Sequence, residues 1–268
     1  MRCDDFRHYD DISRSATVSS TRNAGPIMFA EQAGAYYAAA PFTRVRSFVM
    51  SFNVELARTN MVDNQVRTWD VLDLRVLAAL DAVHRDEFVA DAWRNIAFAD
   101  TPLPLGHGEV MLKPVVVGRL LQGLLVQEHE SVLEIGTGSG YLTACLGQLA
   151  ADVTSIEQHA DLADAARARL QRSGVANARV ETAEALHGWR SDQQFDAVVV
   201  TGAVWQIPAT LLKRVKPGGR LLAVVGESPA MQAQLHLNDG VGIWTVASLF
   251  ETDIPYLNHA QPPQRFVL

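Results

Sequence analysis

The sequence predicts an α/β fold: a doubly wound, mostly parallel sheet with an antiparallel C-terminal edge, preceded by N-terminal helices. Three observations predict it. Apolar runs alternate with helix-compatible segments from residue 131 onward, an order typical of parallel sheets with helices on both faces. The first run, at 131–135, is followed by three glycines at alternate positions. Upstream, residues 53–94 carry apolar side chains at steps of three and four, the period of amphipathic helices.

The first 49 residues differ from the rest of the chain. They are rich in serine and threonine, contain the turn pair Gly25-Pro26, and show no sustained helical or strand period. We expect a disordered extension over residues 1–49. Because regular patterning begins only afterwards, Met50 is a candidate for the natural start of the protein. An intact mass of the native protein that includes residues 1–49 would contradict this hypothesis.

Two or three amphipathic helices are expected in the lead-in that follows. Asp70 and Asp73 are candidate N-caps, and Asp86 is placed to begin a further short turn. The stretch at 101–108 reads TPLPLGHG and is rich in turn residues. A helix is expected at 114–125, since its first residue is proline, which suits the first turn of a helix.

Beyond this helix, strands and helices alternate. Strands are predicted near 131–135, 153–157, 178–182, 195–201 and 220–225, and helices near 140–149, 159–173 and 207–214. Two more strand candidates, near 233–238 and 243–250, are separated by Asn238-Asp239-Gly240. Such a turn sequence favours a hairpin, so the last two strands are expected to form the antiparallel edge.

The turn after the first strand is the most informative feature of the chain. Residues 134–141 read EIGTGSGY, and glycines without a Cβ let a ligand approach the backbone closely. A nicotinamide-binding turn has its third glycine one position later, which disfavours an oxidoreductase. The spacing here resembles the first motif of S-adenosylmethionine-dependent methyltransferases. An acidic residue about 20 positions after such a turn binds the ribose hydroxyls, and Glu157 fits this role.

Composition excludes several classes of protein. The 268 residues are 48% hydrophobic and 20% charged, which suits one globular domain with a substantial core. The net charge of −7 disfavours nucleic acid as a partner. The apolar runs are shorter than the roughly 18 residues of a membrane helix, so no membrane partner is expected. Two distant cysteines give neither a disulfide framework nor a metal site, and they favour a cytoplasmic setting.

Several motifs together resemble the protein-L-isoaspartate O-methyltransferase family, from about residue 54 to 255. The resemblance lies in the helical lead-in, the proline-rich loop, the glycine turn and two later strands. The matching segments are MVDNQVR at 61–67, RVLAAL at 75–80, RDEFV at 85–89, PLPLGHG at 102–108, LEIGTGSGY at 133–141, FDAVVVT at 195–201 and VGE at 225–227. The lead-in and the proline-rich loop are the more specific signals, because methyltransferases with other acceptors generally lack them.

The resemblance implies a fold, a cofactor and a reaction. The fold is a doubly wound Rossmann-like methyltransferase sheet in one domain over 50–268, with the lead-in and substrate loop at 50–125 and the cofactor-binding sheet at 126–268. The expected reaction is methyl transfer from S-adenosylmethionine to the carboxylate of L-isoaspartyl residues in damaged proteins. Apart from the resemblance, we expect a monomer or weak oligomer. The expected cofactor residues are Glu134, Gly136, Thr137, Gly138, Ser139, Gly140, Glu157 and Glu184.

The chain departs from the family pattern on the acceptor side. The family usually reads QTISQP after the proline-rich loop, with the serine hydroxyl near the acceptor carboxylate, but this chain has EVMLKP, so that Leu112 stands in the place of the serine. Glu109 would repel an anionic acceptor if it faced the pocket, an effect that Lys113 could compensate. The catalytic residue is therefore unknown. The substrate-loop candidates are His107, Glu109, Leu112, Thr201 and Trp205.

Two alternatives stay open. The chain could use the same fold and cofactor on a different acceptor, which Leu112, Glu109 and the bulky Trp205 suggest. It could also be a relative that binds the cofactor without isoaspartyl activity. The acidic step Ala183-Glu184-Ala185 replaces the usual Gly-Asp-Gly, so the adenine pocket is expected to be tighter.

Overall fold

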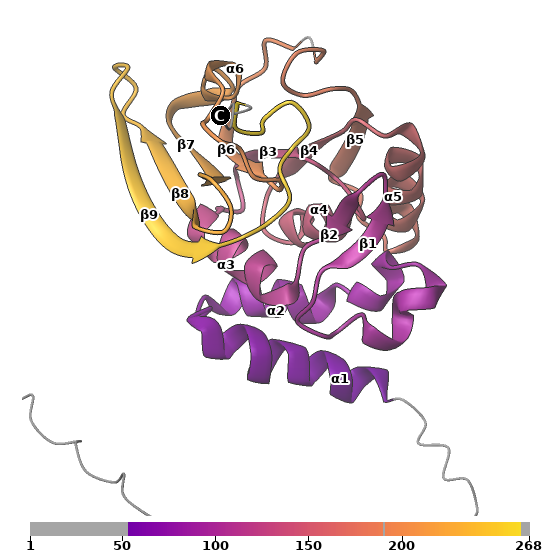
Figure 1. The fold of residues 1–268 in the computed structure, drawn as a ribbon. Helices are drawn as coiled ribbons and strands as arrows, with labels where there is room; N and C mark the ends of the chain where they lie inside the picture. Colours follow the sequence, from indigo (N-terminus) through magenta and orange to yellow (C-terminus); the bar gives the residue numbers. More distant parts are fainter. Residues whose placement is uncertain (1–52, 190, 264–268) are drawn as a thin grey trace, which may run out of the picture. The chain divides into compact units, whose positions relative to one another are not determined.

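The structure is a computed structural model that describes residues 53–189 and 191–263 (Figure 1). The predictions for residues 1–49 and for Met50 as the start lie outside these residues. No helix of the described part is long and apolar enough to cross a membrane.

The lead-in consists of short helices, as the period predicted. Helix α1 (Val54–Asn60) begins at Asn53, whose side-chain oxygen accepts a hydrogen bond from Leu56 N at 3.0 Å. The helix continues through a π-helical turn and a 3-10 turn that ends at Asp70. Asp70 has a left-handed φ of 62°, so it ends this segment, and its prediction as an N-cap was wrong. Asp73 does cap α2 (Leu74–Ala82), because its carboxylate accepts from Arg75 N.

Two 3-10 turns and a small hairpin connect the lead-in to the sheet. The 3-10 turns are Arg85–Phe88, which contains Asp86 in its first turn, and Asp91–Ile96. The turn-rich stretch at 101–108 contains strand β1 (Leu103–Gly106), which pairs antiparallel with β2 (Glu109–Met111) as a separate two-stranded sheet. No strand was predicted at either place.

The main sheet has seven strands in the order β5-β4-β3-β6-β7-β8-β9. The first five are parallel, and β8 and β9 are antiparallel, which confirms the predicted fold class. Figure 1 shows β8 and β9 as a long hairpin at one side of the sheet. The strands are β3 (Ser131–Ile135), β4 (Asp152–Glu157), β5 (Ala178–Thr182), β6 (Phe195–Val200), β7 (Val215–Val225), β8 (Met231–Asn238) and β9 (Trp244–Thr252).

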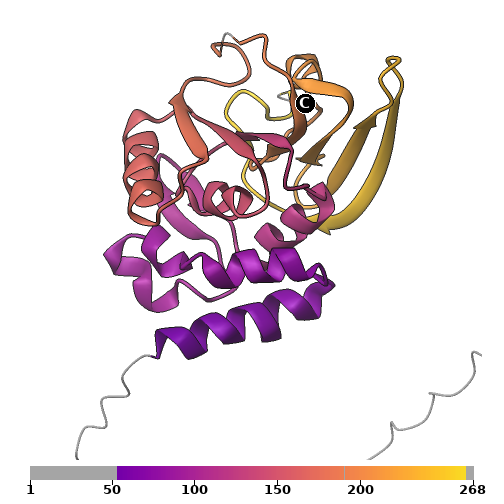
Figure 2. The ribbon, with the colours of Figure 1, turned by 180° about the vertical axis from the view of Figure 1, so that it is seen from behind.

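The sheet separates two hydrophobic clusters. Helices α3 (Pro114–Leu124), α4 (Tyr141–Gly147) and α5 (Ala160–Arg172) pack with the lead-in in the larger cluster. Helix α6 (Ala209–Leu212) contributes to the smaller cluster, on the other face. Alternate residues of one strand enter different clusters, as the pleat of a strand requires. Figure 2 shows the same elements from behind.

Asp196, at the start of β6, ties three strands together. Its carboxylate accepts from Ser131 N at 2.8 Å, from Ser131 Oγ at 2.7 Å and from Lys216 Nζ at 2.8 Å. Partial burial raises the pKa of this carboxyl, but the hydrogen bonds from Lys216 and Ser131 outweigh burial and bring the pKa to about 2.

This geometry predicts that the free energy of unfolding decreases at low pH. The pKa of Asp196 is lower in the folded state than the roughly 3.9 of an unfolded chain, so its contribution is complete above about pH 5 and is lost as the pH falls toward 2. We expect Asp196→Asn to lower the free energy of unfolding by about 1–2 kcal/mol at pH 7 and to differ little from the original protein near pH 2. Urea unfolding at both pH values measures this.

A matched control is available in the lead-in. Asp63 pairs with Arg67 at 3.9 Å on the helix surface, and we expect Asp63→Asn to change stability by less than about 0.5 kcal/mol. A difference between Asp196→Asn and the original protein that stayed constant from pH 7 to pH 2 would contradict the role given to the charge.

Candidate functional site

A pocket lies at the carboxyl ends of the central parallel strands, where ligands bind in open α/β sheets. Its empty space, with the open mouth included, is about 910 Å³. The turn after β3, the end of β4, the β1–β2 hairpin and the C-terminal segment at 255–258 form its walls. Most of the predicted cofactor residues line it, namely Glu134, Gly136, Thr137, Gly138, Ser139, Glu157 and Glu184. Gly140 does not.

The three glycines of the turn have positive φ values, and at each of them a Cβ would approach a different neighbour closely. A Cβ at Gly136 would collide with Oγ1 of Thr201, which donates a hydrogen bond to the Gly136 carbonyl at 2.6 Å. A Cβ at Gly138 would lie 3.1 Å from the side chain of Leu105 in the hairpin. Gly140 begins α4 and packs against Ala166 of α5. The glycine pattern therefore also reflects tight packing around the turn, beside any approach of a ligand.

Glu157 ends β4 with its carboxylate held by the backbone. Oε2 accepts from Gly138 N at 2.8 Å, and Oε1 accepts from His159 N at 3.0 Å. The side chain is buried, and the residue lines the pocket. Each carboxylate oxygen can accept two hydrogen bonds, so both oxygens keep capacity for the hydroxyl groups of a ribose.

Glu134 is completely buried in β3 and has one carboxylate oxygen without a partner. Oε2 accepts from Thr143 Oγ1 at 2.5 Å and from Ser155 Oγ at 2.7 Å, whereas Oε1 has no hydrogen-bond partner among the described residues. Burial raises the pKa of Glu134 to about 7, against the effect of these two hydrogen bonds. Because an unpaired buried oxygen is costly, a donor such as an ammonium group is expected to complete this site.

Glu184 uses its carboxylate to cap its own turn. Oε1 accepts from Leu186 N at 3.0 Å, and Oε2 accepts from His187 N at 2.6 Å and Gly188 N at 3.1 Å. The expected hydrogen bond to an adenine amine can therefore use only the remaining acceptor capacity of this group.

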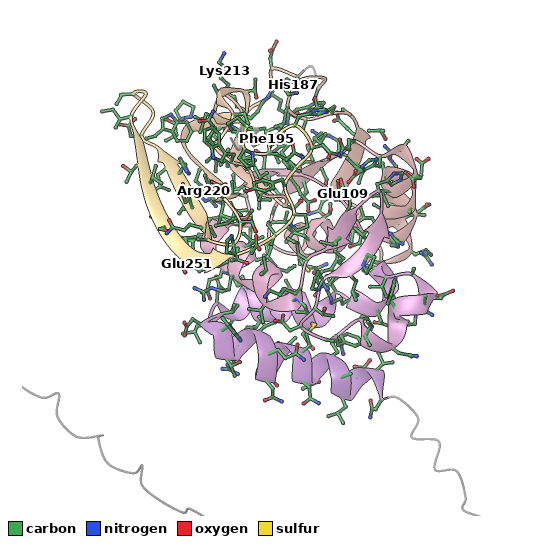
Figure 3. All side chains as sticks on the ribbon, viewed as in Figure 1. Glu109, His187, Phe195, Lys213, Arg220 and Glu251 are labelled. Carbon is green, nitrogen blue, oxygen red and sulfur yellow. The ribbon has the colours of Figure 1, made fainter. Side chains whose placement is uncertain are left out.

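The acceptor side of the pocket is apolar and acidic. Leu112 lines the wall, as do Met111 and Leu105 of the hairpin. Glu109 also lines it, and burial, together with the charge of Glu157, raises the pKa of Glu109. Glu109 is the first residue of β2 and is labelled in Figure 3. No lysine, arginine or histidine is among the described residues that line the pocket, and Lys113 is therefore not part of its wall.

Two predicted candidates lie outside the pocket. His107, at the tip of the β1–β2 hairpin, contacts Asp161 instead of the pocket. Trp205 lines a separate groove. Its backbone N–H donates to Ala260 O at 2.8 Å, which joins this loop to the C-terminal segment. Thr201 does line the pocket, but its hydroxyl donates to the carbonyls of Ile135 and Gly136.

Arg85 is a residue that sequence reasoning missed. Its side chain is completely buried, Nε donates to Ala97 O at 2.7 Å, and Nη2 donates to Leu112 O at 2.8 Å. The guanidinium lies 4.9 Å from the centre of the Tyr141 ring. Arg85 thus fixes the backbone of Leu112, in the pocket wall. An arginine in the family motif at 85–89 was the only available signal.

The pocket residues fit S-adenosylmethionine. The unpaired Oε1 of Glu134 suits an ammonium group, Glu157 suits the ribose hydroxyls, and the bare backbone at Gly138 leaves room beside them. The apolar side chains of Ile156 and Leu186 supply contacts for a flat base. Within the described residues, no three histidine, cysteine or acidic side chains gather to bind a metal.

The fold and the pocket define an α/β methyltransferase that uses S-adenosylmethionine. A family model described as protein-L-isoaspartate(D-aspartate) O-methyltransferase matches residues 57–246, which is more than half of the chain. The chain belongs to the protein-L-isoaspartate O-methyltransferase family.

Individual relatives agree with this assignment. A protein-L-isoaspartate O-methyltransferase 1 of Syntrophobacter fumaroxidans is 40% identical over 183 residues, 68% of this chain and 86% of that protein. A protein-L-isoaspartate O-methyltransferase of Methanoculleus marisnigri is 41% identical over 63% of this chain and 77% of that protein. A Plasmodium falciparum structure in complex with S-adenosyl-L-homocysteine has the same fold, with a TM-score of 0.66 and 18% identity over 75% of this chain and 98% of that one.

Proposed function

We propose that this protein transfers a methyl group from S-adenosylmethionine to the carboxylate of L-isoaspartyl residues in damaged proteins. The observation that carries the proposal is that the family match spans both the lead-in with its hairpin and the cofactor-binding sheet. The acceptor side of the family is thus present together with the donor side. The same observation favours residues 50–268 as one methyltransferase domain.

The reaction requires the protein to position the reactants, and it does not require a strong general base. S-adenosylmethionine, when bound, supplies a methyl group that an acceptor oxygen takes as the carbon–sulfur bond breaks and the bonding pair stays on sulfur. An acceptor carboxyl with a pKa near 3.9 is already ionised at neutral pH. The protein must hold the reactants in line and exclude water. Apolar Leu112, Met111 and Leu142 line the pocket and serve this exclusion.

The donor is held by acidic residues in the proposed arrangement. Glu157 accepts from the ribose hydroxyls, and its orientation is fixed in advance by Gly138 N and His159 N. Glu134 accepts from the donor's ammonium group through Oε1, the oxygen that has no partner in the described residues.

A second candidate function is methyl transfer to a different acceptor. The observation in its favour is that Leu112 offers no hydroxyl and that no basic side chain among the described residues lines the pocket. An anionic acceptor in the pocket would then lie near the carboxylate of Glu109, with no basic side chain in the described pocket wall to balance the two negative charges. A relative that binds the cofactor without isoaspartyl activity is the remaining alternative.

The variant Leu112→Ser tests the acceptor. Restoring a hydroxyl at the end of the hairpin is expected to raise kcat/KM for an isoaspartyl peptide about tenfold over Leu112→Ala, because a hydrogen bond to a charged group contributes about 1.5–3 kcal/mol. Transfer of tritiated methyl groups to the peptide measures this, with the original protein alongside.

Leu112→Ala is the matched control, since it opens the same space without a hydroxyl. Equal activity of the two variants would show that the missing hydroxyl does not limit the reaction. If the original protein binds S-adenosylhomocysteine in calorimetry but methylates no isoaspartyl peptide, the alternative acceptor replaces the first proposal.

The setting proposed for the reaction is the cytoplasm, with the protein as a monomer or weak oligomer. The presence of only two cysteines in 268 residues supports a reducing compartment. The net charge of −7 supports proteins, and not nucleic acids, as acceptors.

A further inference from the structure

The β1–β2 hairpin is a wall of the cofactor pocket that stands apart from the main sheet. Its two strands pair only with each other, in a sheet of their own. Leu105, Glu109 and Met111 of this hairpin line the pocket. Since no strand pairing joins the hairpin to β3 or β4, side-chain contacts decide how it lies over the pocket.

The tip of the hairpin reaches the start of α5 through one residue. His107 donates from Nε2 to the carboxylate of Asp161, at 3.0 and 2.9 Å from its two oxygens. Its ring stacks on the ring of His159, with centres 4.0 Å apart and planes 9° apart. The hydrogen bond from His107 also lowers the pKa of the Asp161 carboxyl. We call His107, His159 and Asp161 the clasp.

The clasp lies directly beside the residue proposed to bind the ribose. His159 is the N-cap of α5, and Asp161 is in its first turn, so both follow Glu157 within four positions. Glu157 accepts from His159 N. A second contact runs alongside, since Glu109 of β2 lies 3.7 Å from His159 Nε2 and 3.5 Å from Gln158 Nε2. The hairpin thus meets the β4–α5 junction at the residues that directly follow Glu157.

His107 holds a conformation that few residues adopt. Its φ is 56°, between Gly106 at 102° and Gly108 at 82°. A Cβ at either glycine would meet no atom within 4 Å, so packing does not force this turn. The left-handed backbone costs energy for a residue other than glycine. The contacts with Asp161 and His159 offset that cost.

We propose that His107 is a positioning residue for the cofactor, which keeps the β1–β2 hairpin closed over the pocket through Asp161 and His159. The inference rests on the proposed function. The pair is partly exposed, since 42% of the His107 side chain and 68% of the Asp161 side chain are accessible to solvent. Exposed pairs contribute little each, which suits a wall that must open to release S-adenosylhomocysteine after every turnover.

The test is a double-mutant cycle on the clasp. His107→Asn keeps a residue that tolerates positive φ but shortens the side chain, and Asp161→Ala removes the acceptor. We expect each variant to raise the Kd for S-adenosylhomocysteine about fivefold, the effect of one exposed ion pair. The release rate in stopped flow should rise to a similar extent. The double variant should also raise the Kd only about fivefold, because either change alone already removes the contact between His107 and Asp161.

The control is Asp164→Ala on the same helix, where Asp164 pairs with Arg167 at 2.5 Å and, among the described residues, makes no hydrogen bond or ion pair to the hairpin. It should bind S-adenosylhomocysteine like the original protein. The melting temperature without ligand separates binding from stability, and His107→Asn should lower it only slightly, because the contacts that it removes are partly exposed. Single variants within twofold of the original protein, or a double variant weakened about 25-fold by simple multiplication, would overturn the proposal. If the original protein itself binds no S-adenosylhomocysteine, the proposed function fails instead.

Discussion

Glu157→Gln is expected to weaken the binding of S-adenosylhomocysteine about 100-fold, which corresponds to roughly 2.7 kcal/mol. Both carboxylate oxygens of Glu157 accept from backbone N–H groups, of Gly138 and of His159. An amide NH₂ in place of one oxygen would face a backbone donor and would displace either the glycine turn or the side chain. The ribose hydroxyls would also lose a charged acceptor, which makes the stronger hydrogen bonds. Isothermal titration calorimetry measures the change.

The matched control for this variant is Glu251→Gln. Glu251 lies exposed in β9, away from the pocket (Figure 3), and the change should leave the affinity as it is. The melting temperature without ligand should also fall in Glu157→Gln, because one buried backbone N–H loses its acceptor, so the affinity is measured at a temperature where both proteins are folded. An affinity within threefold of the original protein would show that Glu157 does not bind the ribose.

Arg85→Ala is expected to lower the free energy of unfolding by about 4 kcal/mol. The change leaves the carbonyls of Ala97 and Leu112 without a donor and opens a cavity beside Tyr141. Burial lowers the pKa of the guanidinium, so relief of a buried charge offsets part of the loss. Urea unfolding at pH 7 measures the difference.

Arg94→Ala serves as the control, because Arg94 is exposed and pairs with Asp91 at 3.3 Å. Its effect should stay below about 0.5 kcal/mol. In Arg85→Ala, the affinity for S-adenosylhomocysteine should also fall, since the Leu112 backbone loses its anchor. If stability is unchanged, the hydrogen bonds of Arg85 only balance the cost of its burial.

The parallel part of the sheet could be predicted closely from the sequence. The expected strands at 131–135 and 178–182 are Ser131–Ile135 and Ala178–Thr182 in the structure. The strand at 131–135 is buried and mostly apolar, as expected for a central parallel strand, whereas 178–182 is a partly exposed edge strand whose limits followed from the alternation of strands and helices. The long strand β7 was predicted to begin at 220 but begins at Val215, because Pro217-Gly218-Gly219 looks like a turn and is instead an irregular part of the strand.

The hairpin that covers the pocket was hidden for a similar reason. Pro102 and Pro104 and the glycines at 106 and 108 predict turns, yet residues 103–106 and 109–111 pair as strands. An edge strand with one unpaired side accepts proline, so the composition was compatible with both. Only the packing of this segment over the glycine turn decided between them.

Some residues of the candidate site could be predicted from the sequence, and others could not. The glycine turn and Glu157 were predicted from spacing alone, and both line the pocket. Arg85 was missed because its partner Leu112 is 27 residues away. Thr143 and Ser155, which bind Glu134, lie on two other elements, α4 and β4. Polar residues in such positions carry no local pattern that indicates a partner.

The sequence by itself determined the order of strands and helices, the cofactor turn with its acidic partner, and the family. The order of elements and the cofactor turn depend on periodicity and spacing within a few tens of residues, and the family follows from the resemblance of several motifs between about residues 54 and 255. The tertiary structure decided that one Glu134 oxygen has no partner among the described residues, that Glu109 lines the pocket, that Trp205 does not, and that His107 contacts Asp161. Each of these is a contact between distant segments, and which polar atoms meet follows from how the whole chain packs.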